Sequence, residues 1–249
     1  MLIIKTFIYI TIISIVTANN EFGIFEAANS HYNEGNYGDS IELYEKIILD
    51  NLHSSYLYYN LGNAYYRQGL VGQSIWAYNK AILLNPRLGD AKYNLEIAMA
   101  SMKDRIVLPS EFLPVQTYIS IKSNYTFNEW LLIGSLVVLF TVCFFVASKF
   151  FILSNGIVQK SLFMLVILIT VLHLILIDLF FEQNTQQSGI IISNEVNAYS
   201  GPFVGENTML FTINEGTRAK IYQKQGDWIE IAIINGDKAW IPSNTLRKL

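Results

Sequence analysis

The segment YYNLGNAYYRQGLVGQSIWAYNKAILLNP, residues 58–86, decides the fold of the first part of this chain. Small residues such as Gly62 would let neighbouring helices approach closely, and large ones such as Tyr78 would fill the space between them. Shifting the sequence by 34 residues places Gly35 on Gly69 and Tyr44 on Tyr78. This period predicts a helix-turn-helix unit that repeats and stacks into a solenoid.

The second copy of the repeat resembles the tetratricopeptide family. The matching signature residues are Tyr58, Leu61, Gly62, Tyr65, Tyr78, Ala81 and Pro86, with Ser74 in place of the usual alanine. The first copy departs more, because Ala28 replaces the signature glycine and Leu52 the proline. Residues 89–106 repeat only the first helix, which suits a terminal cap. We expect positive φ at Gly35 and Gly69, in the turns within each pair, and a helix end before Pro86.

The resemblance also implies a binding groove, because the first helices of stacked repeats line a concave surface. The family's geometry implies the following groove residues: Phe25, Asn29, Tyr32, Asn33, Tyr59, Asn60, Asn63, Tyr66, Arg67, Tyr93 and Asn94. Asn29 and Asn63 are equivalent, and an amide side chain can both donate to and accept from a peptide backbone. Asparagine and tyrosine are common at these positions whatever is bound, so the sequence predicts a surface and not its ligand.

The rest of the chain has the composition of a membrane protein. It has 249 residues, of which 52% are hydrophobic and only 15% charged, whereas about a quarter is usual. Residues 1–18 carry Lys5, an apolar run and small residues at Thr17 and Ala18, which predicts a signal peptide cleaved after Ala18. An uncleaved signal anchor is the alternative. Both interpretations export the residues that follow.

Two long apolar runs predict transmembrane helices over residues 130–148 and 161–181. The loop between them, residues 149–160, contains Lys149 and Lys160 and no acidic residue. Positive charge in a short loop indicates its cytoplasmic side, so both flanking segments are expected outside the cytosol.

The second apolar run contains His173, the candidate intramembrane polar residue. An ionisable side chain in a span is costly unless it faces protein or water. We expect a neutral imidazole that is hydrogen-bonded across a helix interface. Ser135 of the first span, another subunit or another membrane protein could each supply the partner.

Residues 190–249 show short alternating strands and an Asn235–Gly236 hairpin signal, which predicts a small all-β barrel. The spacing resembles the bacterial SH3-like domain through Ser200, Gly201, Pro202, Gly216, Trp228, Gly236 and Trp240. Ala198 or Tyr199 stands where many members have arginine. Tyr199, Trp228 and Trp240 are the candidate surface residues, although the two tryptophans are expected mainly to pack the small core or its rim.

The fold prediction is thus a multidomain membrane protein: an α-helical tetratricopeptide solenoid, a two-helix transmembrane hairpin and a small all-β SH3-like barrel. The expected segments are a signal peptide (1–18), the repeat domain (19–106), a juxtamembrane linker (107–129), the spans (130–148 and 161–181) around a cytoplasmic loop (149–160), a linker (182–189) and the SH3-like domain (190–249). This order resembles the BatE-like proteins of bacterial aerotolerance operons. The resemblance implies an inner-membrane complex with von Willebrand factor A-type proteins and a role in oxidative or envelope stress tolerance.

Two function classes follow for such a chain. The first is a non-enzymatic scaffold in the bacterial inner membrane, with both folded domains periplasmic, protein partners in the groove and a second protein or peptidoglycan on the SH3-like domain. The second is a cell-wall hydrolase or its regulatory subunit. We favour the scaffold, without cofactor or metal, because Cys143 lies in a span and His31, His53 and His173 are far apart in the sequence. The net charge of −3 gives no basic footprint for nucleic acid.

Overall fold

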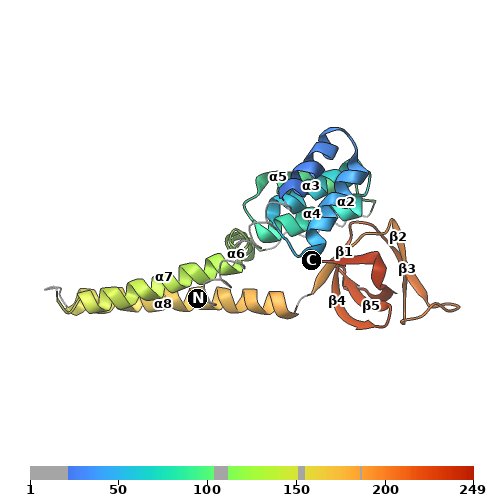
Figure 1. Cartoon of the computed structure of the whole chain (residues 1–249). Coiled ribbons are helices and arrows are strands. Elements are labelled where there is room, and N and C mark those ends of the chain that lie inside the picture. Colours follow the sequence, from blue (N-terminus) through green and yellow to red (C-terminus); the bar gives the residue numbers. More distant parts are fainter. Residues whose placement is uncertain (1–21, 104–111, 151–154, 186) are drawn as a thin grey trace, which may run out of the picture. The chain divides into compact units, whose positions relative to one another are not determined.

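A computed structural model describes residues 22–103, 112–150, 155–185 and 187–249. The expected signal peptide, residues 1–18, lies outside these ranges. The chain divides into two compact units. One unit contains the described residues of Met1–Leu84, Leu88–Val107 and Ser188–Leu249. The other combines Asn85–Arg87 with Leu108–Gln187. Figure 1 shows the helices, the long hairpin and the sheet.

The N-terminal helical region consists of paired antiparallel helices. They cover residues 22–33, α2 Tyr37–Leu49, α3 Ser55–Arg67, α4 Val71–Leu84 and α5 Gly89–Ala100. Gly35 and Gly69 lie in the turns within the first two pairs with φ of 84° and 83°, which confirms the prediction of positive φ. Helix α4 ends two residues before Pro86, as expected.

Helices α3 and α4 pack through a contact of a small residue against a large side chain. Leu61, Tyr78 and Ala81 are almost completely buried. A Cβ atom at Gly62 would lie 2.6 Å from the ring of Tyr78, so only glycine permits this approach of α3 to α4. Ser54 begins α3 by accepting a hydrogen bond from the Leu57 amide.

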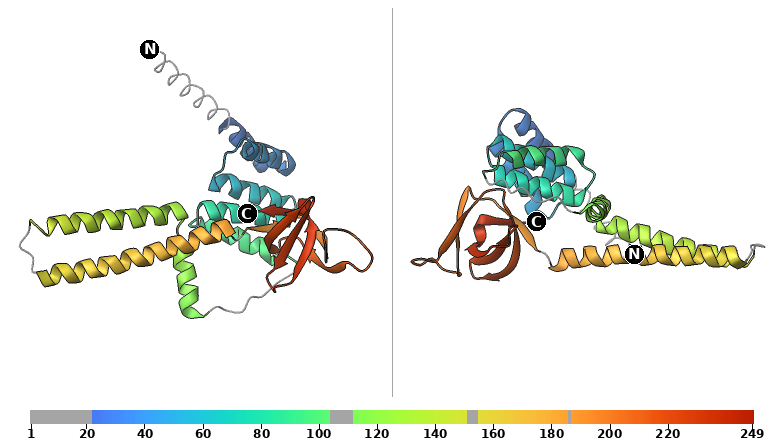
Figure 2. Two further views of the ribbon diagram at one scale, coloured as in Figure 1. Left: turned by 90° about the horizontal axis from the view of Figure 1, so that it is seen from below. Right: turned by 180° about the vertical axis from the view of Figure 1, so that it is seen from behind.

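The C-terminal region is one antiparallel sheet that curls on itself (Figure 2). Its strands are β1 Ser188–Ile191, β2 Glu195–Tyr199, β3 Met209–Asn214, β4 Arg218–Gln225, β5 Trp228–Ile233, β6 Lys238–Pro242 and β7 Leu246–Lys248, in the order β3-β2-β6-β5-β4-β1-β7. Ile229, Ile231 and Ile241 point into its core. Gly236, with φ of 94°, lies in the turn between β5 and β6, which confirms the predicted hairpin.

The helical region and the sheet form one compact unit, although the two apolar helices separate them in sequence. Ile190 of β1 is buried in the same hydrophobic cluster as the repeat helices. The indole Nε1 of Trp76 donates a hydrogen bond of 2.8 Å to the Lys248 carbonyl. The amide of Gly72, in the first turn of α4, donates one of 2.7 Å to Glu215. The C-terminal strand, β7, therefore helps to stabilise the repeat helices.

The second unit contains α6 Leu113–Ser123, α7 Phe127–Ala147 and α8 Asn155–Thr185. Helices α7 and α8 run antiparallel as a hairpin (Figures 1 and 2). Trp130, Leu172 and Ile175 are buried between them, while most other apolar side chains of the pair are exposed. By length and composition, both helices could cross a membrane.

The hairpin differs from expectation in three respects. The interval predicted as a linker, residues 107–129, contains helix α6, because Pro114 falls in its first turn, where a missing amide donor costs nothing. Helix α8 begins at Asn155, six residues before the predicted span. His173 is not bonded to Ser135, one of the three kinds of partner that the sequence left open. The Nδ1 atom of His173 instead lies 2.7 Å from the Ile169 carbonyl of its own helix, and Ser135 donates to Leu131.

Candidate partner-binding groove

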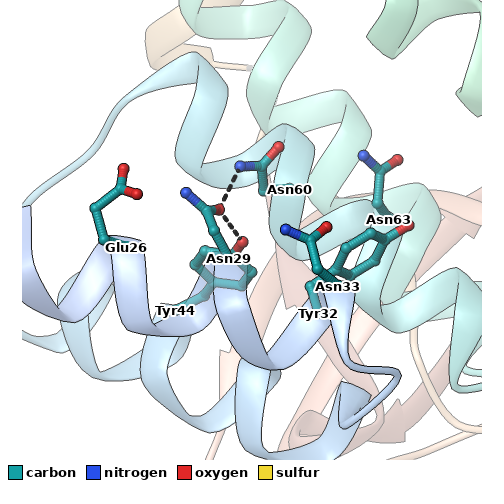
Figure 3. A pocket seen from close by; sticks show the side chains of 7 residues that line it. All are labelled: Glu26, Asn29, Tyr32, Asn33, Tyr44, Asn60 and Asn63. Carbon is teal, nitrogen blue, oxygen red and sulfur yellow. Dashed lines mark hydrogen bonds between the residues drawn. The ribbon is translucent and has the colours of Figure 1, made fainter.

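A cavity of about 390 Å³ opens on the first helices of the two helix pairs (Figure 3). It is lined by Glu26, Asn29, Tyr32, Asn33, Tyr44, Asn60 and Asn63. Five of these residues were predicted for the groove from the repeat geometry: Asn29, Tyr32, Asn33, Asn60 and Asn63. The structure therefore brings side chains from two repeats together around one hollow.

The oxygen of Asn29 holds the first part of the cavity together. It accepts a hydrogen bond of 2.6 Å from the Tyr44 hydroxyl, which belongs to the second helix of the same pair. It also accepts one of 3.0 Å from the amide nitrogen of Asn60 in the next pair (Figure 3). One amide oxygen thus joins three helices.

The same arrangement recurs 34 residues later. The oxygen of Asn63 accepts hydrogen bonds of 2.8 Å from the Tyr78 hydroxyl and of 2.8 Å from the Asn94 amide nitrogen. Asn94 lies on α5, the last helix of the array. The two networks form a row of amide side chains along the first helices of successive pairs.

The phenols fix the direction of these amides. Burial raises the pKa of Tyr44 to about 12, and burial likewise raises the pKa of Tyr78. Both hydroxyls therefore stay protonated at neutral pH and donate to the asparagine oxygens. The nitrogen of Asn29 is turned away from these partners and remains a donor for a ligand, while the Asn60 oxygen remains an acceptor.

Glu26 gives the cavity a negative charge that the sequence analysis missed. It is the one charged side chain among the described lining residues. Glu26, Asn29 and Asn33 are spaced at i, i+3 and i+7, so they share one face of the helix over residues 22–33. That spacing could have identified Glu26. Tyr44, which the sequence analysis named only as the repeat equivalent of Tyr78, also reaches the cavity.

The other predicted groove residues do not line this cavity. Phe25 packs on the ring of Tyr44, and Tyr59 packs on the ring of Tyr78. The Arg67 guanidinium lies 5.1 Å from the centre of the Tyr37 ring. Two further predicted residues are Tyr66, which is half-buried against the helical core, and Tyr93, which is exposed.

The candidate surface residues of the sheet have unequal exposure. The Tyr199 and Trp228 rings meet edge to face, 5.5 Å apart between centroids, and both residues are half-buried. Trp240 is only 9% exposed, but it alternates with Ala239 and Ile241 of the core cluster and therefore lies on the opposite face of β6. Tyr199 and Trp228 therefore form an aromatic pair at the surface, and Trp240 serves packing.

Residues 193–248 match the family model of the bacterial SH3 domain. The C-terminal domain is a bacterial SH3 domain. No curated protein matches the chain. The SH3 domain is thus preceded by a helical region and by two long apolar helices.

Proposed function

We propose that this chain is a non-enzymatic, membrane-anchored adaptor whose helical groove holds an extended segment of a partner protein. The repeated asparagine–tyrosine network carries the proposal. Its oriented amides offer donors and acceptors along the first helices, which suits the alternating N–H and C=O groups of an extended peptide. The protonated phenols at neutral pH favour a role in binding over acid–base chemistry.

The fold supports reading the helical pairs as tetratricopeptide repeats, because their turns and networks recur every 34 residues. The bacterial SH3 domain supports a second contact with a protein or the cell envelope. With the BatE-like order of segments, this makes the proposed setting an inner-membrane complex in envelope or oxidative stress tolerance. The proposed partners are von Willebrand factor A-type proteins for the groove and a protein or peptidoglycan for the SH3 domain.

The proposed topology is a membrane hairpin with both folded domains in the periplasm. Helices α7 and α8 have the length and composition to cross a bilayer. The segments before and after them belong to one compact unit. Two segments that fold together lie on the same side of a membrane, which requires an even number of crossings between them. A pair of spans meets this requirement.

The groove can be tested with Asn29→Asp. An aspartate keeps an oxygen that accepts from Tyr44 and Asn60, but it replaces the free N–H donor by an acceptor. We expect partner capture from native membranes to weaken roughly tenfold, the cost of one mispaired polar group, without loss of helical circular dichroism. Asn207→Asp, in an exposed loop of the SH3 domain, makes the same charge change and is the matched control. Equal capture by the two variants would place the interface outside the groove.

A further inference from the structure

Helix α6 crosses the axis of the α7–α8 hairpin instead of continuing it. Figure 1 shows α6 nearly end-on where α7 lies in the plane of the picture, and the left view of Figure 2 shows it crossing the end of the hairpin. If α7 and α8 span a bilayer, a helix in this direction lies parallel to the membrane plane. The residues of α8 that α6 contacts set the depth of α6 along the bilayer normal.

Three polar contacts attach α6 to the end of the hairpin. The Lys122 Nζ atom lies 2.8 Å from Asp178 and 2.9 Å from Glu182, and the Tyr118 hydroxyl donates a hydrogen bond of 2.6 Å to Asp178. In addition, the Trp130 indole donates to the Lys122 carbonyl at 3.1 Å. Asp178 and Glu182 are one helical turn apart, about 6 Å along the axis. The contacts therefore place α6 at the last apolar turn of α8.

These contacts also fix the rotation of α6. Residues at i, i+3, i+4 and i+7 share a helix face, so Tyr118 and Lys122 lie on the same face as Val115 and Ile119. Gln116, in contrast, lies with Ser120 and Ser123 on another face, whose one apolar member is Leu113 at the start of the helix. Because Tyr118 and Lys122 are directed to α8, the apolar face turns toward the hairpin side and the polar face turns away.

The apolar face has no protein cover in the described chain. Val115 and Ile119 are more than 40% exposed, and Phe112, at the start of the helix, is 74% exposed. No residue of α6 is buried. Most apolar side chains of α7 and α8 are exposed as well, and hydrocarbon would cover them in a spanning hairpin. Tyr118, Tyr125 and Trp130 lie at the same end and are the residue types found at membrane–water interfaces.

We propose that α6 is an interfacial helix that binds the periplasmic surface of the lipid bilayer. Its Val115 and Ile119 face enters the boundary between headgroups and acyl chains, and its Gln116 and Ser120 face meets water. Lys122 neutralises Asp178, which would otherwise be an unpaired carboxylate in the last turn of a span. The inference rests on the proposed membrane insertion of α7 and α8.

The test uses spin labels on the full-length chain in nanodiscs of phosphatidylethanolamine and phosphatidylglycerol, in a Cys143→Ser background. Single cysteines replace Val115, Ile119, Gln116 or Ser120, and collisions with oxygen and with a water-soluble nickel chelate are measured. We expect a loss of nickel collisions at 115 and 119 relative to 116 and 120. That alternation would follow the helical period of about 3.6 residues.

A label at Leu139→Cys, in the middle of α7, separates this inference from the insertion that it needs. If 139 is shielded from nickel while all four α6 positions are accessible, α6 does not bind lipid and the hairpin proposal stands. If 139 is also accessible, both are wrong. Protection of 115 and 119 only in native membranes, and not in nanodiscs, would assign the apolar face to a protein partner. In Lys122→Gln, we expect 119 to gain nickel collisions, because the anchor to Asp178 is lost.

Discussion

Arg247 and Glu45 form a two-point ion pair, although 202 positions separate them in sequence. The Nη1 and Nη2 atoms of Arg247 lie 2.7 Å and 2.6 Å from the two carboxylate oxygens of Glu45. The guanidinium also stacks on Trp76, 3.6 Å from the ring centre, and donates to the Tyr65 hydroxyl. Through Arg247, the last strand of the SH3 domain contacts helices α2, α3 and α4 of the repeat region.

Arg247→Ala should destabilise the whole compact unit. The substitution leaves the half-buried Glu45 carboxylate without its cation and removes the stacking on Trp76, at a cost of about 1–3 kcal/mol. Chemical unfolding of the full-length chain in detergent would measure the change. Lys224→Ala, at an exposed position of β4, removes the same charge and should have little effect. Equal stability of the two variants would mean that the ion pair adds nothing.

The tyrosine network predicts a loss of stability at high pH. The pKa of Tyr44 is raised from 10.0 to about 12 in the folded state, so its contribution is fully present below pH 10 and is lost as pH rises toward 12. The loss should reach roughly 2–3 kcal/mol. Urea unfolding at pH 8 and pH 11 should show wild type losing more stability than Tyr44→Phe. Tyr56→Phe, at an exposed phenol, is the control, and identical pH profiles for wild type and Tyr44→Phe would contradict the assignment.

Gly62→Ala should lower stability, whereas Gly38→Ala should raise it. A methyl group at Gly62 would lie 2.6 Å from the Tyr78 ring, an overpacking that costs about 1–3 kcal/mol. At Gly38, in α2, no atom lies within 4 Å of the position of an added Cβ atom. Alanine there should therefore raise the free energy of unfolding by about 0.5–1 kcal/mol through its higher helix propensity. Thermal unfolding of the two variants gives both signs in one experiment. A stabilised Gly62→Ala would show that α3 and α4 can move apart without penalty.

His173→Leu should leave the α7–α8 hairpin intact. The imidazole is exposed and bonded to its own helix through Ile169, so its removal should change hairpin stability by no more than about 0.5 kcal/mol. Leu172→Ala, at the neighbouring position that is buried between the helices, should loosen the pair. The contrast tests which face of α8 meets α7.

Thiol cross-linking can measure that hairpin contact. A Cβ atom at Gly134 would lie 3.7 Å from Leu176, so cysteines at these two positions report the packed state in a Cys143→Ser background. We expect efficient cross-linking with His173→Leu and reduced cross-linking with Leu172→Ala. A reduced yield with His173→Leu would restore a structural role for the imidazole between the helices.

The hairpin topology predicts that reporter fusions after Ser101 and after Leu249 behave alike. Both positions belong to the compact unit that contains the repeat helices and the SH3 domain. An exported phosphatase should be active at both, and a cytoplasmic reporter at neither. A fusion within the loop between the spans, after Lys149, should give the opposite result. Different results at Ser101 and Leu249 would be incompatible with a folded unit that includes both.

The sequence by itself determined the features that depend on local or periodic signals. The 34-residue period located the turns at Gly35 and Gly69, because only glycine adopts positive φ there without strain. Asn235–Gly236 located the β5–β6 turn for the same reason. Two long apolar runs predicted α7 and α8, since apolar length is readable without knowledge of any contact.

Only the tertiary structure decided which side chains meet across elements. Asn29 accepts two hydrogen bonds from other helices. Arg247 of the SH3 domain pairs with Glu45 of α2, and Lys122 of α6 pairs with Asp178 of α8. Helix α6 was missed because proline usually interrupts a helix, and Pro114 is compatible with α6 only since it falls in the first turn. Such contacts depend on where distant backbone segments are placed, and a periodic pattern in one segment contains no information about the side chain opposite it.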